Sequence, residues 1–144
     1  MKSDGHCGFH AIAVLLGMSE HNWRDIRINL IGELHTFCNE YTELYESAMR
    51  VNELIYTLSY FECVAHRQHW MTLPDMGHLI ASKYNVILVH LSRMQCLTYL
   101  PLRSVAPSVM QHRIITIDFV DDCHFVHLLL FNNLFIYFYI IMLI

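Results

Sequence analysis

Residues 4–16 read Asp-Gly-His-Cys-Gly-Phe-His-Ala-Ile-Ala-Val-Leu-Leu and carry the strongest structural signal in the chain. The second half of this run is almost wholly apolar and Gly17 follows it, so we expect a buried helix from Cys7 to Leu16. Cys7 would open that helix, where the aligned backbone dipoles stabilise a thiolate. Gly5 can adopt a positive φ and turn the N–H groups of the loop toward one point, as an oxyanion hole requires. The same residues also suit an ordinary small cysteine in a core.

Three further helices are expected before residue 85. Residues 19–45 carry apolar side chains at steps of three and four, which predicts one long amphipathic helix with Arg27 and Glu33 on its polar face. A second, less regular helix is expected over residues 52–63. Residues 72–84 begin with Thr-Leu-Pro-Asp, a typical helix start with proline in the first turn.

The pattern then changes to short runs rich in β-branched and aromatic residues. Four strands are expected, at residues 85–92, 96–102, 113–120 and 124–130. Residues 121–123, Asp-Asp-Cys, join the last two strands as a tight hairpin. Helices followed by a mainly antiparallel sheet indicate an α+β domain.

The composition excludes several classes of protein. At 144 residues the chain is long enough for one compact domain, and its formal charge of −4 supplies no basic surface for nucleic acid. The 11 histidines and 5 cysteines are scattered without the spacing of zinc ligands, so we expect no metal and no cofactor. An odd number of cysteines behind a polar N-terminus predicts reduced thiols in the cytoplasm or nucleus.

The C-terminus has a different composition from the rest. We expect a domain at residues 1–130 and a hydrophobic tail at residues 131–144. The uncharged run 134–144 is shorter than the roughly 20 residues that a membrane helix needs. A buried strand, or an end that is not native to the domain, explains the tail better than membrane association.

A histidine at the start of the last predicted strand is the second chemical candidate. Strand alternation places His124 and Val126 on one face and Phe125 and His127 on the other, so only one of the two histidines can face Cys7. We favour His124, because the mouth of a strand is where a base can reach the terminus of a helix.

Several ordered blocks of the chain together resemble the ovarian-tumour (OTU) family of cysteine proteases. Residues 4–13 resemble its nucleophile motif, Asp-Gly-x-Cys followed by an apolar pair, a basic residue and Ala. Residues 70–81 and 85–92 resemble the middle of OTU-like domains found in transposon-derived genes. Residues 123–126, Cys-His-Phe-Val, resemble the histidine motif of the family. The resemblance implies a papain-like OTU fold, with N-terminal helices packed on a small, mainly antiparallel C-terminal sheet.

The same resemblance implies a function and a set of site residues. The chain would be a cysteine-type deubiquitinase that hydrolyses (iso)peptide bonds of ubiquitin, with ubiquitin or a ubiquitinated protein as its partner. Cys7 would be the nucleophile and His124 its general base, while Asp4 braces the oxyanion loop formed by Gly5 and His6.

Departures from the family pattern keep an alternative open. Many members carry Asn or Asp two residues beyond the histidine to orient the imidazole, and this chain has Val126 there. Asp118, Asp121 or Asp122 would have to replace that group. His10 stands where the family usually has arginine. The alternative is a catalytically inactive OTU-like module that binds ubiquitin or another partner, or a shortened relic of a mobile element.

Overall fold

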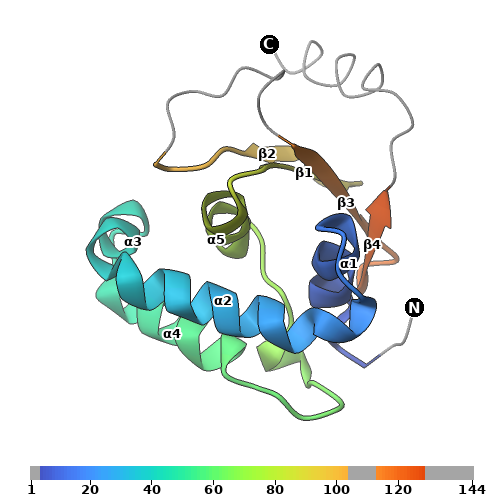
Figure 1. The fold of residues 1–144 in the computed structure, drawn as a ribbon, viewed down its shortest axis with the longest axis horizontal. Helices are drawn as coiled ribbons and strands as arrows, with labels where there is room; N and C mark the ends of the chain where they lie inside the picture. The colour runs from blue at the N-terminus through green and yellow to red at the C-terminus, as the bar shows by residue number, and fades with distance from the viewer. Residues whose placement is uncertain (1–3, 104–112, 129–144) are drawn as a thin grey trace.

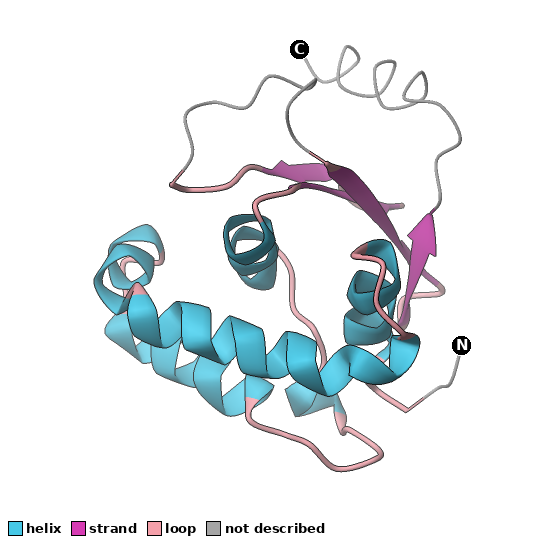
Figure 2. Ribbon diagram, viewed as in Figure 1, coloured by secondary structure: helices cyan, strands magenta, loops and turns pink. Residues whose placement is uncertain are grey.

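A layer of helices and a four-stranded sheet make up residues 4–103 and 113–128, the part of the chain that the computed structural model describes (Figure 1). The two central helices, α1 and α5, lie between the sheet and the outer helices α2 and α4 (Figure 2). This arrangement confirms the α+β prediction. The helices in chain order are α1 (Cys7–Leu15), α2 (Trp23–Thr36), α3 (Cys38–Leu44), α4 (Ala48–Leu58) and α5 (Asp75–Tyr84).

The first helix follows its prediction closely, and the long helix predicted next does not. Gly17, at φ +82°, takes the left-handed conformation that ends α1. The predicted helix over 19–45 is wrong as one element: it divides into a short 3-10 turn, η1 (Glu20–Asn22), then α2 and α3. The break falls at Phe37, at φ −116° and ψ 35°. An apolar stripe continues across such a bend, so periodicity alone does not reveal it.

The fourth helix also departs from its predicted bounds. Helix α4 begins after Ser47, whose hydroxyl accepts a hydrogen bond from the backbone N–H of Arg50 at 3.1 Å, so the prediction of 52–63 was shifted along the chain. A second 3-10 turn, η2 (Arg67–His69), follows it. Helix α5 then ends at Asn85, a left-handed residue at φ 51°, as its predicted bounds require.

The four strands form one sheet in the order β2-β1-β3-β4. β1 pairs antiparallel with β2 and β3 pairs antiparallel with β4, which confirms a mainly antiparallel sheet, while β1 and β3 run parallel. The predicted hairpin is present, with Asp121 and Asp122 both at positive φ and the N–H of Cys123 donating to Val120. The strands are β1 (Ile87–Ser92), β2 (Leu97–Tyr99), β3 (Ile114–Val120) and β4 (His124–Leu128).

One face of the sheet packs against α1 and α5 and closes the core. Leu88, Ile115 and Ile117 on this face are buried, and β4 lies along α1. Gly77 in α5 lets Tyr99 approach so closely that an added Cβ would lie 2.5 Å from the tyrosine ring. The ring of Tyr99 therefore packs directly against the backbone of α5, which only a glycine at this position allows.

Within residues 4–103 and 113–128, no helix has the length and apolar character needed to span a membrane. The predicted tail at 131–144 and the predicted domain boundary at 130 lie outside the described residues. The division of the chain into these two parts stays a prediction.

Candidate active site

The thiol of Cys7 lies at the junction of α1 and β4. Cys7 is the first residue of α1 and is only 8% exposed. The backbone N–H of Phe125 in β4 donates to its Sγ at 3.4 Å. A strand N–H points nearly in the plane of the sheet, and β4 is the last strand of the described sheet. The thiol therefore lies beside the outer edge of β4, between the two faces of the sheet.

His124 directly precedes this contact in the chain. It is the first residue of β4, and its carbonyl carbon is bonded to the Phe125 nitrogen that donates to Cys7. Phe125 is buried on the α1 side, so alternation places His124 and Val126 on the opposite face. The backbone of His124 therefore lies beside the Cys7 thiol.

The loop before Cys7 is held in a tight, glycine-dependent turn. Gly5 has φ +79°, the positive value that the sequence predicts. A Cβ on Gly5 would lie 2.2 Å from the carbonyl oxygen of Ala65. The N–H of Ala65 donates to the carbonyl of Asp4 at 2.7 Å, and the indole N–H of Trp70 donates to the carbonyl of Ala65 at 3.1 Å. Only glycine fits here without moving this segment.

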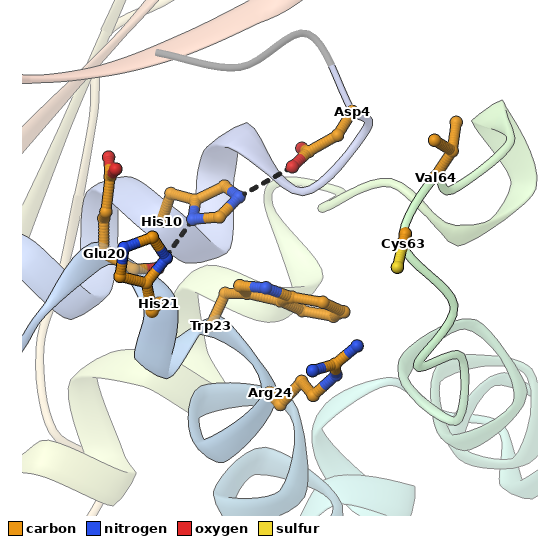
Figure 3. Close-up of a pocket in the computed structure, with 8 residues that line it drawn as sticks. All are labelled: Asp4, His10, Glu20, His21, Trp23, Arg24, Cys63 and Val64. Atoms are coloured by element: carbon orange, nitrogen blue, oxygen red, sulfur yellow. Dashed lines mark hydrogen bonds and ion pairs between the residues drawn. The ribbon is translucent and has the colours of Figure 1, made fainter.

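Asp4 braces the loop through both carboxylate oxygens, and Figure 3 shows the contact of one of them with His10. Its Oδ1 accepts the backbone N–H of His6 at 2.9 Å, and its Oδ2 lies 3.0 Å from Nε2 of His10. Burial would raise the pKa of Asp4, but the hydrogen bonds from His6 and His10 outweigh it and lower the pKa. Since the N–H of His6 is committed to Asp4, any oxyanion donors must come from the neighbouring amides.

His10 makes two polar contacts through its ring. Its Nδ1 lies 2.6 Å from the carbonyl oxygen of Glu20, while its Nε2 faces the Asp4 carboxylate. The ring of His10 thus connects Asp4 to the 3-10 turn η1 that precedes α2.

His6 is fixed as a neutral ring by its partners. Its ring stacks on Trp23 at 3.6 Å, and Nδ1 lies 3.0 Å from the guanidinium of Arg27. Arginine can only donate, so Nδ1 accepts and Nε2 carries the proton that is donated to the carbonyl of Glu62 at 2.9 Å. Burial, assisted by the charge of Arg27, lowers the pKa of His6.

Arg27 is a fully buried cation at the centre of this network, and the predicted polar face of its helix is wrong at this position. Its guanidinium donates to the carbonyls of Thr57 at 2.9 Å and His69 at 2.7 Å, and lies 3.9 Å over the ring of Phe9. Burial lowers its pKa to about 10, which leaves it charged at neutral pH. Glu33, also predicted on the polar face, is likewise buried.

Two cavities flank the loop and the thiol. The larger, about 420 Å³, lies behind Asp4 and His10 (Figure 3). The second is a groove of about 280 Å³ near the Cys7 thiol, since Phe125, which contacts that thiol, forms part of its wall, and Met71, also in the wall, packs against Gly8. The lining of this groove is Arg67, Trp70, Met71, Thr72, Leu73, His90, Phe119, Asp122 and Phe125. His90 was not singled out from the sequence.

Of the three aspartates considered as orienting groups, Asp118 shares a face with the histidine. It pairs directly with Val126 across β3 and β4, so its carboxylate starts from the same face as His124. Asp122 lines the groove on the other side, and Asp121 lies in the hairpin turn. Among the residues that the structure describes, no cluster of three or more His, Cys, Asp or Glu side chains can hold a metal ion.

No family model and no curated protein matches this sequence. Its structure is similar to the Hazara virus OTU solved bound to ubiquitin, with a TM-score of 0.60 and 16% identity over 92% of this chain and 80% of that one. The OTU domain protease of Farallon virus gives a TM-score of 0.58 at 17% identity, covering 92% and 83%. The OTU domain of OTUD1 gives 0.60 at 11% identity, covering 85% and 77%. The chain therefore has the OTU fold that its sequence blocks predict.

Proposed function

We propose that the chain is an OTU-type cysteine protease that hydrolyses ubiquitin (iso)peptide bonds, with Cys7 as nucleophile and His124 as base. The contact between the Phe125 N–H and the Cys7 thiol carries this proposal, because it joins the helix terminus to the residue that follows the histidine. The Hazara virus neighbour, solved bound to ubiquitin, supports ubiquitin as the partner.

The proposed reaction begins with transfer of the Cys7 proton to His124. The thiolate, stabilised by the N-terminus of α1, attacks the carbonyl carbon of the terminal glycine of ubiquitin. The resulting oxyanion accepts hydrogen bonds from the backbone N–H of Cys7, which as the first residue of α1 has no partner within the helix, and from the N–H of Gly5 in the loop before it. His124 then protonates the leaving lysine amine, and the acyl group remains on sulfur as a thioester.

Hydrolysis of the thioester completes the cycle. His124 takes a proton from water, the hydroxyl adds to the thioester carbonyl, and the carbon–sulfur bond breaks to release the ubiquitin carboxylate and the thiolate. Asp4 holds the oxyanion loop in place during both steps. Asp118 is proposed to orient His124 in place of the residue that Val126 replaces, because it lies on the same face of the sheet.

A catalytically inactive module with the same fold is the second candidate. Two observations favour it: Val126 stands where the family carries an orienting side chain, and the Cys7 thiol is almost wholly covered. In this case ubiquitin or another partner would bind without covalent chemistry.

The test is a reaction with ubiquitin that carries a thiol-reactive group at its C-terminus. We expect a covalent adduct with the full chain, and no adduct with Cys7→Ala or His124→Ala. Cys63→Ala and His127→Ala are matched controls, an exposed thiol and a histidine on the other face of β4, and both should react normally. A folded chain that forms no adduct would support the inactive module instead.

The state of the cysteines supports the proposed location in the cytoplasm or nucleus. All five are free thiols, and two of them, Cys38 and Cys63, are exposed. Exposed thiols persist where glutathione keeps the compartment reducing. Fractionation of cells that express the tagged chain would test this location.

A further inference from the structure

His90 is a buried histidine that the proposed reaction does not use. It lies in β1 and is 8% exposed. Both of its ring nitrogens are enclosed, and neither has a hydrogen-bond partner among residues 4–103 and 113–128. A buried polar group without a partner destabilises the fold by about 1–3 kcal/mol. A position that lowers stability in this way calls for an explanation outside the packing of the core.

The strand register shows where His90 points. It pairs with Ile117 of β3, and Ile117 pairs with His127 of β4, so His90 starts from the face on which Phe125 is buried. The rings of His90 and Phe125 lie 6.1 Å apart. His90 is accordingly part of the lining of the groove of about 280 Å³, together with Trp70 and Phe119.

This groove leads to the nucleophile. Phe125 both lines the groove and donates its backbone N–H to Cys7. Met71 lines the groove and lies so close to Gly8 that an added Cβ there would be 2.8 Å from its sulfur. A chain that occupies the groove therefore passes within reach of the thiol.

The chemistry of the lining indicates what such an occupant offers to His90. Burial lowers the pKa of His90, although the charge of Asp118 acts in the opposite direction. A neutral imidazole presents one donor and one acceptor, which match the carbonyl and the N–H of a peptide backbone. A carboxylate or an ammonium group would use only one of the two nitrogens. The aromatic rings of Trp70, Phe119 and Phe125 form apolar walls that suit a flat main chain.

We propose that His90 is a substrate-binding residue that hydrogen-bonds the main chain of the substrate's C-terminal tail in the groove beside Cys7. This inference rests on the proposed function, because the tail enters the groove to present its terminal carbonyl to the thiol. The contribution of His90 is to binding of the tail, and the chemical step leaves its ring unchanged.

Two substitutions separate hydrogen bonding from shape. His90→Phe fills the space without a donor or acceptor, and His90→Gln keeps one of each. His78→Phe is the matched control, since His78 is a half-buried histidine against Tyr99 and is not part of the groove lining. Each full-length variant is reacted with the ubiquitin warhead over a range of concentrations, which yields a half-saturating concentration and a maximal rate.

The expected result is a change in binding without a loss of stability. His90→Phe should raise the half-saturating concentration about tenfold, the value of one lost pair of hydrogen bonds, with the maximal rate unchanged. His90→Gln should recover most of that loss. The unfolding temperature of His90→Phe should equal or exceed that of the original chain, because the substitution removes an unpaired buried group. His78→Phe should leave the half-saturating concentration unchanged.

Three outcomes would overturn the inference. Equal half-saturating concentrations for the original chain and His90→Phe would remove His90 from recognition while the proposed function stood. A fall in unfolding temperature in both His90 variants would show that the ring is structural. No adduct with the folded original chain would defeat the proposed function, and the inference that rests on it, whatever the variants did.

Discussion

The thiol of Cys7 lies between two regions whose polar atoms are paired to very different extents. On one side, the carboxylate of Asp4 and the rings of His6 and His10 each have two hydrogen-bond partners. On the other side, both ring nitrogens of His90, which lines the groove, are buried without a partner in the described chain. Apart from the Nε of Arg27, which also lacks a partner in the described chain, the polar atoms of the first region are paired, and we call it the complete half of the site. The second region, the incomplete half, has polar groups left for an occupant.

This difference follows from the function that we propose for each half of the site. Donors that stabilise an oxyanion act best when they are fixed before the reaction, so the loop around Gly5 gains from a rigid network. Groups that recognise a substrate chain must stay unpaired until the chain arrives, and this lowers the stability of the free protein. The rigid hydrogen-bonded network and the unpaired groups of the groove thus lie on opposite sides of the Cys7 thiol.

The largest effect is expected on the stability of the fold when the guanidinium of Arg27, at the centre of the complete half, is removed. Arg27→Met should lower the free energy of unfolding by about 3–4 kcal/mol, because it leaves buried carbonyls and the Nδ1 of His6 without a donor. Arg27→Lys keeps the charge but cannot donate in as many directions, so its loss should be intermediate. Urea unfolding measures both.

Arg24→Met is the control for this prediction. Arg24 is an exposed arginine of the same helix, and its guanidinium donates to the carbonyl of Phe61 and lies over the ring of Trp23. Its substitution should change the free energy of unfolding by less than about 1 kcal/mol. A similar loss of stability in Arg27→Met and Arg24→Met would show that the network around His6 stabilises the fold no more than an exposed arginine does.

A second prediction concerns the pH dependence of stability. Burial lowers the pKa of His6, His78 and His90 in the folded chain, so each binds its proton more readily when unfolded, near its ordinary value of 6.5. The free energy of unfolding should be constant above about pH 7 and fall as the pH drops below 6.5, by up to about 1.4 kcal/mol per pH unit for each histidine. Asp4, with its lowered pKa, adds a further loss only as the pH falls below 3.8.

The contribution of His90 to this pH dependence can be measured by itself. His90→Phe should reduce the slope between pH 6.5 and pH 5, because one fewer neutral histidine is buried. His21→Phe substitutes an exposed histidine and should leave the slope as it was. Urea unfolding at half-unit steps of pH measures the slope, and stability that stayed flat from pH 7 to pH 5 would contradict the neutral state of these rings.

Local chemistry made part of this fold predictable. Gly17 ends α1 and the Asp121-Asp122 turn joins β3 to β4 because each depends on residues that are adjacent in the chain. The bend at Phe37 and the parallel pairing of β1 with β3 depend on contacts between distant segments, which periodicity does not record. The order of helices and strands could therefore be predicted from the sequence. The bend that divides the predicted long helix could not.

The candidate site divides in the same way. Asp4, Gly5 and Cys7 lie in one short motif, and the structure places them together as expected. Arg27 was assigned to a polar face, although it lies four residues after Trp23 and three before Leu30 and so shares their buried stripe. His90 likewise follows Leu88 at a spacing of two, on the core face of β1. Residue type outweighed position in the prediction for Arg27, and His90 was not singled out at all. Position was the better guide to the burial of both residues.

The smallest effect is expected on the rate of adduct formation when Asp118 is substituted. If Asp118 orients His124 across the strand pair, Asp118→Asn should slow adduct formation with the ubiquitin warhead about fivefold, since a partly exposed charge contributes roughly 1 kcal/mol. Asp121→Asn changes the same charge in the hairpin turn and should react at the original rate. The pH profile distinguishes orientation from structure: loss of the carboxylate should move the acidic limb of the rate, whereas mere loosening of β3 would lower the rate at every pH. Equal rates for the two variants would remove Asp118 as the group that orients His124, while the proposed function itself stood.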